Sequence, residues 1–194
     1  MRAALLLAAG GSRRFGPRDK LLATLWGKPL LLHALERARE TGTRIVVVTD
    51  GRARVGRLLH GTKDRRLTII RARDARRGLS ASLAAGLRAL RPIERELLIF
   101  LADMPLAGAP RRLRLPARME AARPERSGQP GHPLLIRTAA ARSVRLRGDR
   151  GFAAELPRAR IAALGGTPGN LLDIDDRAAL RRARHRIVQR KGQR

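Results

Sequence analysis

The residues best suited to chemistry lie near the start of the chain, where an apolar run, residues 3–7, leads into a glycine-rich segment. Gly10, Gly11 and Gly16 lack a Cβ, so the backbone there turns sharply and approaches a ligand closely. The segment also holds a hydroxyl and two cations suited to phosphate oxygens: Ser12, Arg14 and Lys20. We interpret it as a polyphosphate-binding loop, although its spacing matches neither GxGxxG nor GxxxxGK[ST].

A carboxylate, Asp103, directly follows a second apolar run, residues 96–102. In an open parallel sheet, the ligand crevice lies beyond the carboxyl ends of the strands. Mg²⁺ is a hard cation that prefers carboxylate oxygen, and it is the usual counter-ion of a triphosphate. Asp103 is therefore a candidate magnesium ligand; the alternative is a turn cap or a partner for an arginine.

Apolar periodicity predicts the elements that must position these residues. The first half alternates expected strands with expected helices: strands 2–8, 44–49, 67–71 and 96–102, and helices 29–41, 51–60 and 79–90. Further expected elements are strands at 133–137 and 160–164 and helices at 138–145, from about 151, and at 176–185. This order indicates an α/β fold, a three-layer sandwich around a mostly parallel sheet. Residues 107–128, rich in Arg, Pro and Ala, show no strand pattern.

Length and composition favour one globular domain. The 194 residues, 43% of them hydrophobic, predict a single domain over residues 1–185 and a disordered basic tail over 186–194. Cysteine is absent, which excludes a disulfide framework and a thiolate metal site. No apolar run approaches the ~20 residues that span a bilayer, and the apolar start is too short for a signal peptide. We expect a cytoplasmic protein with no membrane partner.

The chain is strongly basic, with a formal net charge of +27 that comes almost entirely from arginine. Such a charge favours anionic partners, including nucleotides and nucleic acid. The arginines are spread along the sequence, and 3 Phe, 1 Trp and no Tyr leave few platforms on which bases could stack. We interpret most of the charge as solvated surface and do not expect a nucleic-acid partner; a basic nucleic-acid-binding protein remains the rival from another class.

Five ordered segments resemble the MobA-like nucleotidyltransferases, and within them the molybdenum cofactor cytidylyltransferase branch. The segments are Leu7-Ala8-Ala9-Gly10-x-Ser12-x-Arg14-Phe15-Gly16 with Lys20, Gly27-Lys28-Pro29-Leu30-Leu31, Arg77-Gly78-Leu79-Ser80-Ala81-Ser82-Leu83, Leu101-Ala102-Asp103-Met104-Pro105, and Gly131-His132-Pro133. Weaker matches are residues 146–151 and Asp173-Ile174-Asp175. The resemblance implies a Rossmann-like nucleotidyltransferase fold. Residues 107–128 lack the apolar strand that similar proteins carry before the Gly-His-Pro turn.

The resemblance also implies site residues. Arg14, Lys20 and Asp103 would be catalytic, with Asp103 and Asp175 as metal ligands; Asp173 and Asp176 are the alternatives to Asp175. The nucleotide would contact Leu7, Ala8, Ala9, Gly10, Gly11, Ser12, Arg14, Gly16, Lys20, Gly78, Ser80 and Ser82. The acceptor would contact Gly131, His132, Pro133 and Asp149. Simpler interpretations are helix caps for Ser80 and Ser82, a structural histidine for His132 and a turn for Asp149.

The implied reaction transfers a nucleoside monophosphate from an NTP to a phosphorylated acceptor and releases pyrophosphate, with Mg²⁺ as the cofactor. Ala9 in Leu-Ala-Ala-Gly resembles the cytidylyl branch, which favours CTP and molybdenum-bound molybdopterin. A molybdoenzyme or its chaperone is a further candidate partner. The alternatives are guanylyl transfer from GTP to the same cofactor, transfer to a sugar or polyol phosphate, and a degenerate relative that binds nucleotide without catalysis.

Overall fold

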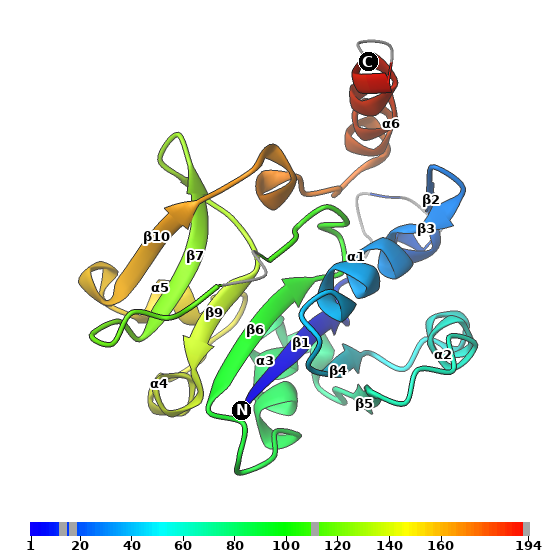
Figure 1. Ribbon diagram of the computed structural model, residues 1–194. Coiled ribbons are helices and arrows are strands. Elements are labelled where there is room, and N and C mark those ends of the chain that lie inside the picture. Colours follow the sequence, from blue (N-terminus) through cyan, green and yellow to red (C-terminus); the bar gives the residue numbers. More distant parts are fainter. Residues whose placement is uncertain (12–14, 16–18, 110–112, 192–194) are drawn as a thin grey trace.

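One eight-stranded sheet forms the centre of the protein, in the order β10-β7-β9-β6-β1-β4-β5, with β8 paired to β7 (Figure 1). The computed structural model describes residues 1–11, 15, 19–109 and 113–191, with side chains as far as residue 185. The strands are β1 (Arg2–Ala8), β4 (Arg44–Thr49), β5 (Leu67–Arg71), β6 (Glu96–Leu101), β7 (Ala121–Arg126), β8 (Gln129–Pro130), β9 (Leu134–Arg137) and β10 (Ile161–Gly165).

Strand β1 lies at the middle of the parallel half of the sheet. It pairs in parallel with β4 on one side and β6 on the other, so that Leu5 lies opposite both Val46 and Ile99. Strand β5 extends this half beyond β4. On the other side, β9 runs antiparallel to β6 and to β7, and β10 runs parallel to β7. The sheet is therefore mixed but mostly parallel, as the alternating pattern predicts.

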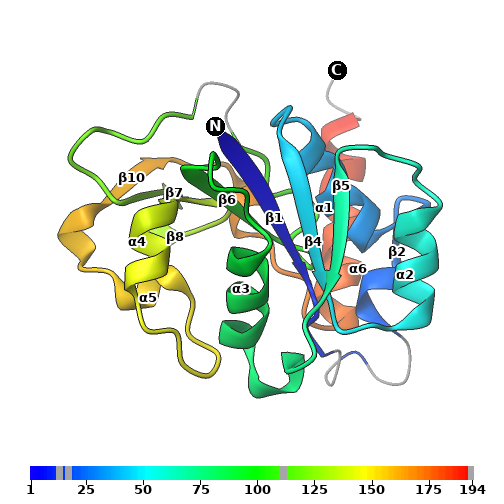
Figure 2. The ribbon, with the colours of Figure 1, turned by 90° about the horizontal axis from the view of Figure 1, so that it is seen from below.

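Helices cover both faces of the sheet (Figure 2). The helices of the described chain are α1 (Leu30–Arg39), α2 (Ala53–His60), α3 (Leu79–Arg88), α4 (Thr138–Ser143), α5 (Phe152–Glu155) and α6 (Arg177–Lys191). Short 3₁₀ turns are η2 (Lys20–Leu22), η3 (Ala75–Arg77), η4 (Arg158–Arg160) and η5 (Pro168–Leu171). Successive β1 side chains point to opposite faces: Leu5 and Leu7 pack in a core cluster with α3, α4 and α5, whereas Leu6 and Ala8 pack with α1 and α2. The fold is therefore a three-layer α/β/α sandwich.

A smaller apolar cluster joins the last helix to an early hairpin. Strands β2 (Thr24–Leu25) and β3 (Lys28–Pro29) form the hairpin, and α6 lies beside it at the top of Figure 1. The cluster contains Leu25, Leu180 and Ile174 together with Phe15. This contact brings the segment that precedes α6 next to the first loop of the chain.

The sequence predictions of the parallel strands are confirmed, and two others are wrong. Residues 107–128 were expected to lack a strand, but they contain β7, although this strand includes Pro124 and has no β-branched side chain. The strand forms because β9 and β10 supply partners on both sides, so pairing overrides local propensity. The last helix is also longer than expected: it continues to Lys191, whereas the sequence predicted an end near residue 185.

None of the helices in the described part of the chain combines the length and apolar character that crossing a bilayer requires.

Candidate functional site

Strands β1 and β6 end side by side, and the candidate site lies just beyond them. The Ala102 amide donates a hydrogen bond of 3.0 Å to the Leu7 carbonyl, which continues the pairing of the two strands past their last ladder residues. Because both strands run in the same direction, the glycine segment after β1 and Asp103 after β6 leave the sheet at the same edge. This is the edge at which the sequence places the ligand crevice.

Lys20 occupies the centre of this site. Its Nζ lies 2.8 Å from Asp103 Oδ2 and 2.8 Å from Asp175 Oδ1, and the side chain is buried. Asp19 Oδ1 accepts a hydrogen bond of 3.0 Å from the Leu21 amide, which caps the 3₁₀ turn that carries Lys20. The structure therefore brings together three of the predicted site residues from the beginning, the middle and the end of the chain.

Asp173 joins this group as a third carboxylate. One carboxylate oxygen of each of Asp103, Asp173 and Asp175 lies within 4.8 Å of the other two. The Ile174 amide donates a hydrogen bond of 3.0 Å to the Asp103 carbonyl, and the Ile174 side chain is buried. Ile174 thereby anchors the segment, while the aspartates on either side of it remain exposed beside Asp103.

Two residues of the site, Asp173 and Lys20, have shifted pKa values. Loss of hydration, and then repulsion by Asp103 and Asp175, raises the pKa of Asp173 to about 6. Burial opposes the charged form of Lys20, but attraction and hydrogen bonds from Asp103 and Asp175 outweigh it and raise the Lys20 pKa above its ordinary value. Lys20 is therefore a fixed cation between two of the three carboxylates.

The donor set suits a divalent cation. Mg²⁺ and Mn²⁺ prefer hard oxygen ligands, and the three clustered groups offer only carboxylate oxygen. Asp103 and Asp175 are the two metal ligands expected from the sequence, and Asp173, named there as an alternative, stands with them. Asp176 does not belong to the described cluster: its Oδ1 accepts a hydrogen bond of 2.6 Å from the Ala179 amide, in the first turn of α6.

The other residues expected to contact the nucleotide, apart from Lys20, fall into three groups. Leu7, Ala8 and Ala9 are buried in the sheet and its continuation, whereas Gly10 and Gly11 are exposed beyond it. Ser12, Arg14 and Gly16 lie outside the described residues. Gly78, Ser80 and Ser82 lie at the start of α3.

The start of α3 also holds Asp149, which the resemblance assigns to the acceptor. Asp149 Oδ1 accepts a hydrogen bond of 3.1 Å from the Leu79 amide, and Gly148 accepts one of 2.9 Å from the Ser80 amide. Gly78 has a φ of 106°, and a Cβ at this position would lie 2.6 Å from Asp149 Oδ1. The N-cap residue of α3 is Gly78, and Ser80 and Ser82 lie inside the helix. The interpretation of these two serines as caps is therefore wrong.

His132 and its neighbours are held by a buried amide that the sequence analysis missed. Asn170 Nδ2 donates to the His132 carbonyl at 2.7 Å and to the Gly108 carbonyl at 2.8 Å, and a Cβ at Gly131 would collide with the Asn170 carbonyl. The His132–Pro133 peptide bond is cis. Desolvation lowers the pKa of His132, whose Nδ1 lies 3.3 Å from the Ile99 carbonyl. The Gly-His-Pro turn is thus built into the fold next to β6.

Arg52, in the turn between β4 and α2, is a second residue that the sequence analysis missed. It contacts Asp19, Asp50 and the carbonyls at the end of β1. Its position soon after β4, which pairs in parallel with β1, is the signal that places it at this edge of the sheet.

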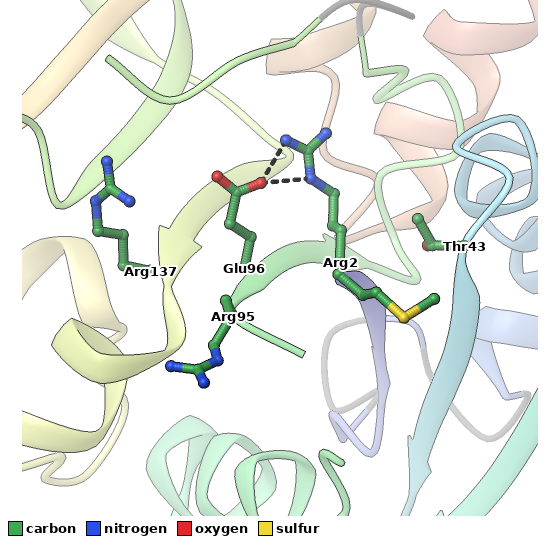
Figure 3. A pocket seen from close by; sticks show the side chains of 6 residues that line it. Arg2, Thr43, Arg95, Glu96 and Arg137 are labelled. Atoms are coloured by element: carbon green, nitrogen blue, oxygen red, sulfur yellow. Dashed lines mark hydrogen bonds and ion pairs between the residues drawn. The ribbon is translucent and has the colours of Figure 1, made fainter. Parts of the chain in front are cut away.

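A separate cavity of about 470 Å³ lies at the opposite, amino-terminal edge of β1 and β6. Its lining comprises Met1, Arg2, Thr43, Arg95, Glu96 and Arg137. Figure 3 shows the Arg2 guanidinium paired with the Glu96 carboxylate, at 2.6 Å. The cavity contains none of the residues expected to do chemistry.

Comparisons with known proteins show the family and the fold of the chain. Residues 4–162 match the MobA-like NTP transferase domain. A search of curated proteins finds no match.

Three of the similar solved structures span nearly the whole chain. A nucleotidyl transferase from Methanothermobacter thermautotrophicus has a TM-score of 0.81 and 21% identity over 98% of this chain and 99% of its own. Rv0371c from Mycobacterium tuberculosis, in complex with manganese, has a TM-score of 0.70 and 21% identity over 95% and 98%. Molybdopterin-guanine dinucleotide biosynthesis protein A from Archaeoglobus fulgidus has a TM-score of 0.66 and 20% identity over 96% and 99%. At these identities the likeness establishes the fold, which confirms the expected Rossmann-like α/β architecture.

Proposed function

Because the chain belongs to the MobA-like NTP transferase family, we propose that it transfers a nucleoside monophosphate from CTP to a phosphorylated acceptor and releases pyrophosphate. One observation carries the proposal: Lys20 Nζ lies 2.8 Å from both Asp103 and Asp175 at the edge where the glycine segment leaves the sheet. This arrangement gathers a cation for phosphate, carboxylates for a metal ion and a loop for a nucleotide in one place.

Asp103, Asp173 and Asp175 would hold Mg²⁺ in this proposal. Their carboxylate oxygens lie within 4.8 Å of one another, and the similar Rv0371c structure was obtained with manganese, a cation of the same oxygen preference. When bound, the cation neutralises charge on the triphosphate and on the departing pyrophosphate.

Lys20 orients the phosphates. An ammonium group carries three N–H donors, so Lys20 can retain one carboxylate and donate to a phosphate oxygen with another hydrogen. Its raised pKa keeps it charged throughout the neutral range. Backbone amides after β1, with Arg14, would complete the anion site, because amides and guanidinium groups stabilise charge that develops on leaving phosphate.

The attacking group would be a phosphate of the acceptor. A phosphomonoester has a second pKa near ~6, so it is mostly dianionic at neutral pH and needs no general base. The described centre, one lysine and three carboxylates, would then bind phosphate and the metal ion, and none of the carboxylates is required as a base. Catalysis then depends on positioning and on charge neutralisation.

The acceptor side is proposed around Gly131, His132 and Pro133, with Asp149 beside α3. Strand β7, which the sequence did not predict, pairs with β9 on this side of the sheet, and its presence supports a folded acceptor half. We propose molybdenum-bound molybdopterin as the acceptor and a molybdoenzyme or its chaperone as the recipient of the product. Guanylyl transfer from GTP and transfer to a sugar or polyol phosphate are the alternatives.

The test is pyrophosphate release by the purified protein with Mg²⁺, each of CTP, GTP, ATP and UTP, and either molybdenum cofactor or a polyol phosphate. We expect release with CTP and molybdenum cofactor, and loss of that release in Lys20→Ala. Circular dichroism of the variant checks that it is folded. If no nucleotide binds or reacts while random RNA binds with a steep loss of affinity in salt, the nucleic-acid-binding rival is correct.

A further inference from the structure

Arg52 links the two ends of the segment between β1 and η2, which includes the glycines. Its Nη2 donates to the Ala8 carbonyl at 3.0 Å and to the Gly10 carbonyl at 3.3 Å, both at the start of the segment. Its Nη1 lies 2.8 Å from Asp19 Oδ2, at the end of the segment. One planar guanidinium therefore contacts described residues on both sides of the loop.

The arginine is itself held in place. Asp50 Oδ1 accepts from Arg52 Nε at 2.8 Å and from the Arg52 amide at 3.3 Å, so the same carboxylate fixes the side chain and the backbone of Arg52. Asp50 and Arg52 follow β4, which is paired with β1 along its whole length. A guanidinium offers five donors in a rigid fork, and here every nitrogen of that fork has a partner.

The contact with Asp19 connects Arg52 to the proposed catalytic centre. Asp19 uses Oδ2 for Arg52 and Oδ1 for the Leu21 amide, so that it caps the turn in which Lys20 lies. Lys20 in turn reaches Asp103 and Asp175 at 2.8 Å. The chain of contacts runs from Arg52 through Asp19 to the backbone that directs the Lys20 ammonium.

We propose that Arg52 is a positioning residue that clasps the nucleotide loop and sets Lys20 for the reaction. This inference rests on the proposed function. Lysine replaces arginine only in part at such a site: it keeps the positive charge, but a single ammonium lacks the planar fork that spans two carbonyls and a carboxylate.

The test compares Arg52→Met and Arg52→Lys with Arg39→Met. Arg39 is a matched control because its side chain is 27% exposed, like that of Arg52, and its Nε also lies 2.8 Å from an aspartate, Asp64. Hydrogen–deuterium exchange is measured on peptides that cover residues 4–25. Steady-state pyrophosphate release is measured with Mg²⁺, CTP or GTP, and the acceptor that supports release by the wild type, molybdenum cofactor or a polyol phosphate. The fraction of folded protein is determined for every variant.

In Arg52→Met we expect faster exchange confined to residues 9–21, a raised KM for the nucleotide and a fall of roughly 100-fold in kcat/KM, as expected when reacting groups are slightly misplaced. Arg52→Lys should recover part of the loss, and Arg39→Met should behave like the wild type. Unchanged exchange would overturn the proposal. The proposal would also be overturned if KM stayed unchanged and kcat fell only in proportion to the folded fraction of the variant. Such a result is expected when a residue has a purely structural role.

The two proposals fail in different ways. If the wild-type protein releases no pyrophosphate with any nucleotide, the proposed function fails, and the exchange comparison alone decides whether Arg52 clasps the loop. If the wild type is active and Arg52→Met keeps its KM and kcat, the clasp fails and the proposed function stands.

Discussion

The carboxylates at the two edges of the parallel half of the sheet are paired in different ways. At the amino-terminal edge, Glu94 is matched by partners: Arg44 donates to both of its oxygens at 2.8 Å, and the Arg91 amide donates at 2.7 Å. At the carboxyl-terminal edge, Asp103, Asp173 and Asp175 lie within 4.8 Å of one another, and Lys20 pairs with two of them.

The difference contrasts a carboxylate that is fully paired with carboxylates that are crowded. A carboxylate whose oxygens are all occupied contributes to folding and has little capacity to bind anything else. Three carboxylates placed together repel one another and cost stability, which agrees with the metal-binding role that we propose for them. The arginine-lined cavity of Figure 3 lies at the same edge as Glu94, and there Arg2 Nε and Nη2 both donate to one oxygen of Glu96.

The largest expected effect is on activity, in Asp103→Asn. Asparagine keeps the shape of the side chain but removes the charge that pairs with Lys20 and that would bind the metal ion. We expect kcat/KM for pyrophosphate release to fall about 100-fold or more, since one preorganised charge contact contributes about 3 kcal/mol to the barrier. The urea midpoint should remain close to that of the wild type. Near-normal turnover in this variant would show that the carboxyl-terminal edge is not the site.

The next effect is on stability, in Glu94→Gln at the other edge. Loss of the carboxylate leaves the largely buried Arg44 guanidinium without its charge partner, and breaking such a pair costs about 3 kcal/mol. Urea denaturation measures the difference. Glu96→Gln is the control: its pair with Arg2 is more exposed, so the loss should be less than about 1 kcal/mol. Equal losses of stability in Glu94→Gln and Glu96→Gln would show that burial does not make the Arg44–Glu94 pair contribute more than the Arg2–Glu96 pair.

The Glu94 effect should depend on pH. Burial opposes ionisation of Glu94, but its hydrogen bonds and attraction to Arg44 and Arg91 outweigh it and lower its pKa below the ordinary value of 4.5. Its ionised form therefore stabilises the folded protein fully above the unfolded-state pKa, and this stability is lost as the pH falls through the lower folded-state pKa. The difference between wild type and Glu94→Gln should be constant from pH 6 to pH 8 and shrink below pH 4.5. A difference that persists in acid would instead point to packing.

The smallest expected effect is a gain in folding stability, in contrast to the loss expected for Glu94→Gln. Asp173→Asn removes one of three mutually repelling carboxylates, so at neutral pH and without metal it should stabilise the fold, by less than about 1 kcal/mol because solvent screens an exposed group. The same variant should bind Mn²⁺ more weakly in a calorimetric titration. Loss of stability in the metal-free protein would show that Asp173 is held by attraction and not strained by its neighbours.

The sequence predicts the parallel half of the sheet, and with it the position of Asp103 near the first loop, because both depend on order along the chain. The addition of Asp175 to this group came from the resemblance to the MobA-like nucleotidyltransferases. Strands 2–8, 44–49 and 67–71 are apolar enough to be recognised individually, and the carboxyl ends of parallel strands share one edge. Strand β7 was not predicted because pairing with β9 and β10 stabilises it, whereas its own composition does not favour a strand.

Arg52 and Asn170 were missed for a different reason. Neither belongs to a pattern in the sequence, and each acts through contacts with residues 33 to 62 positions away. One of many arginines in a chain of net charge +27 does not stand out until its partners are visible.

The ion pair between Lys20 and Asp175 joins residues 155 positions apart. During synthesis the ribosome releases Lys20 early, but its second carboxylate emerges only after the whole sheet has left the exit tunnel. Closing so large a loop is slow compared with forming local structure, so a nascent chain would bring together Lys20 and Asp175, two residues of the proposed site, as one of the last events of folding.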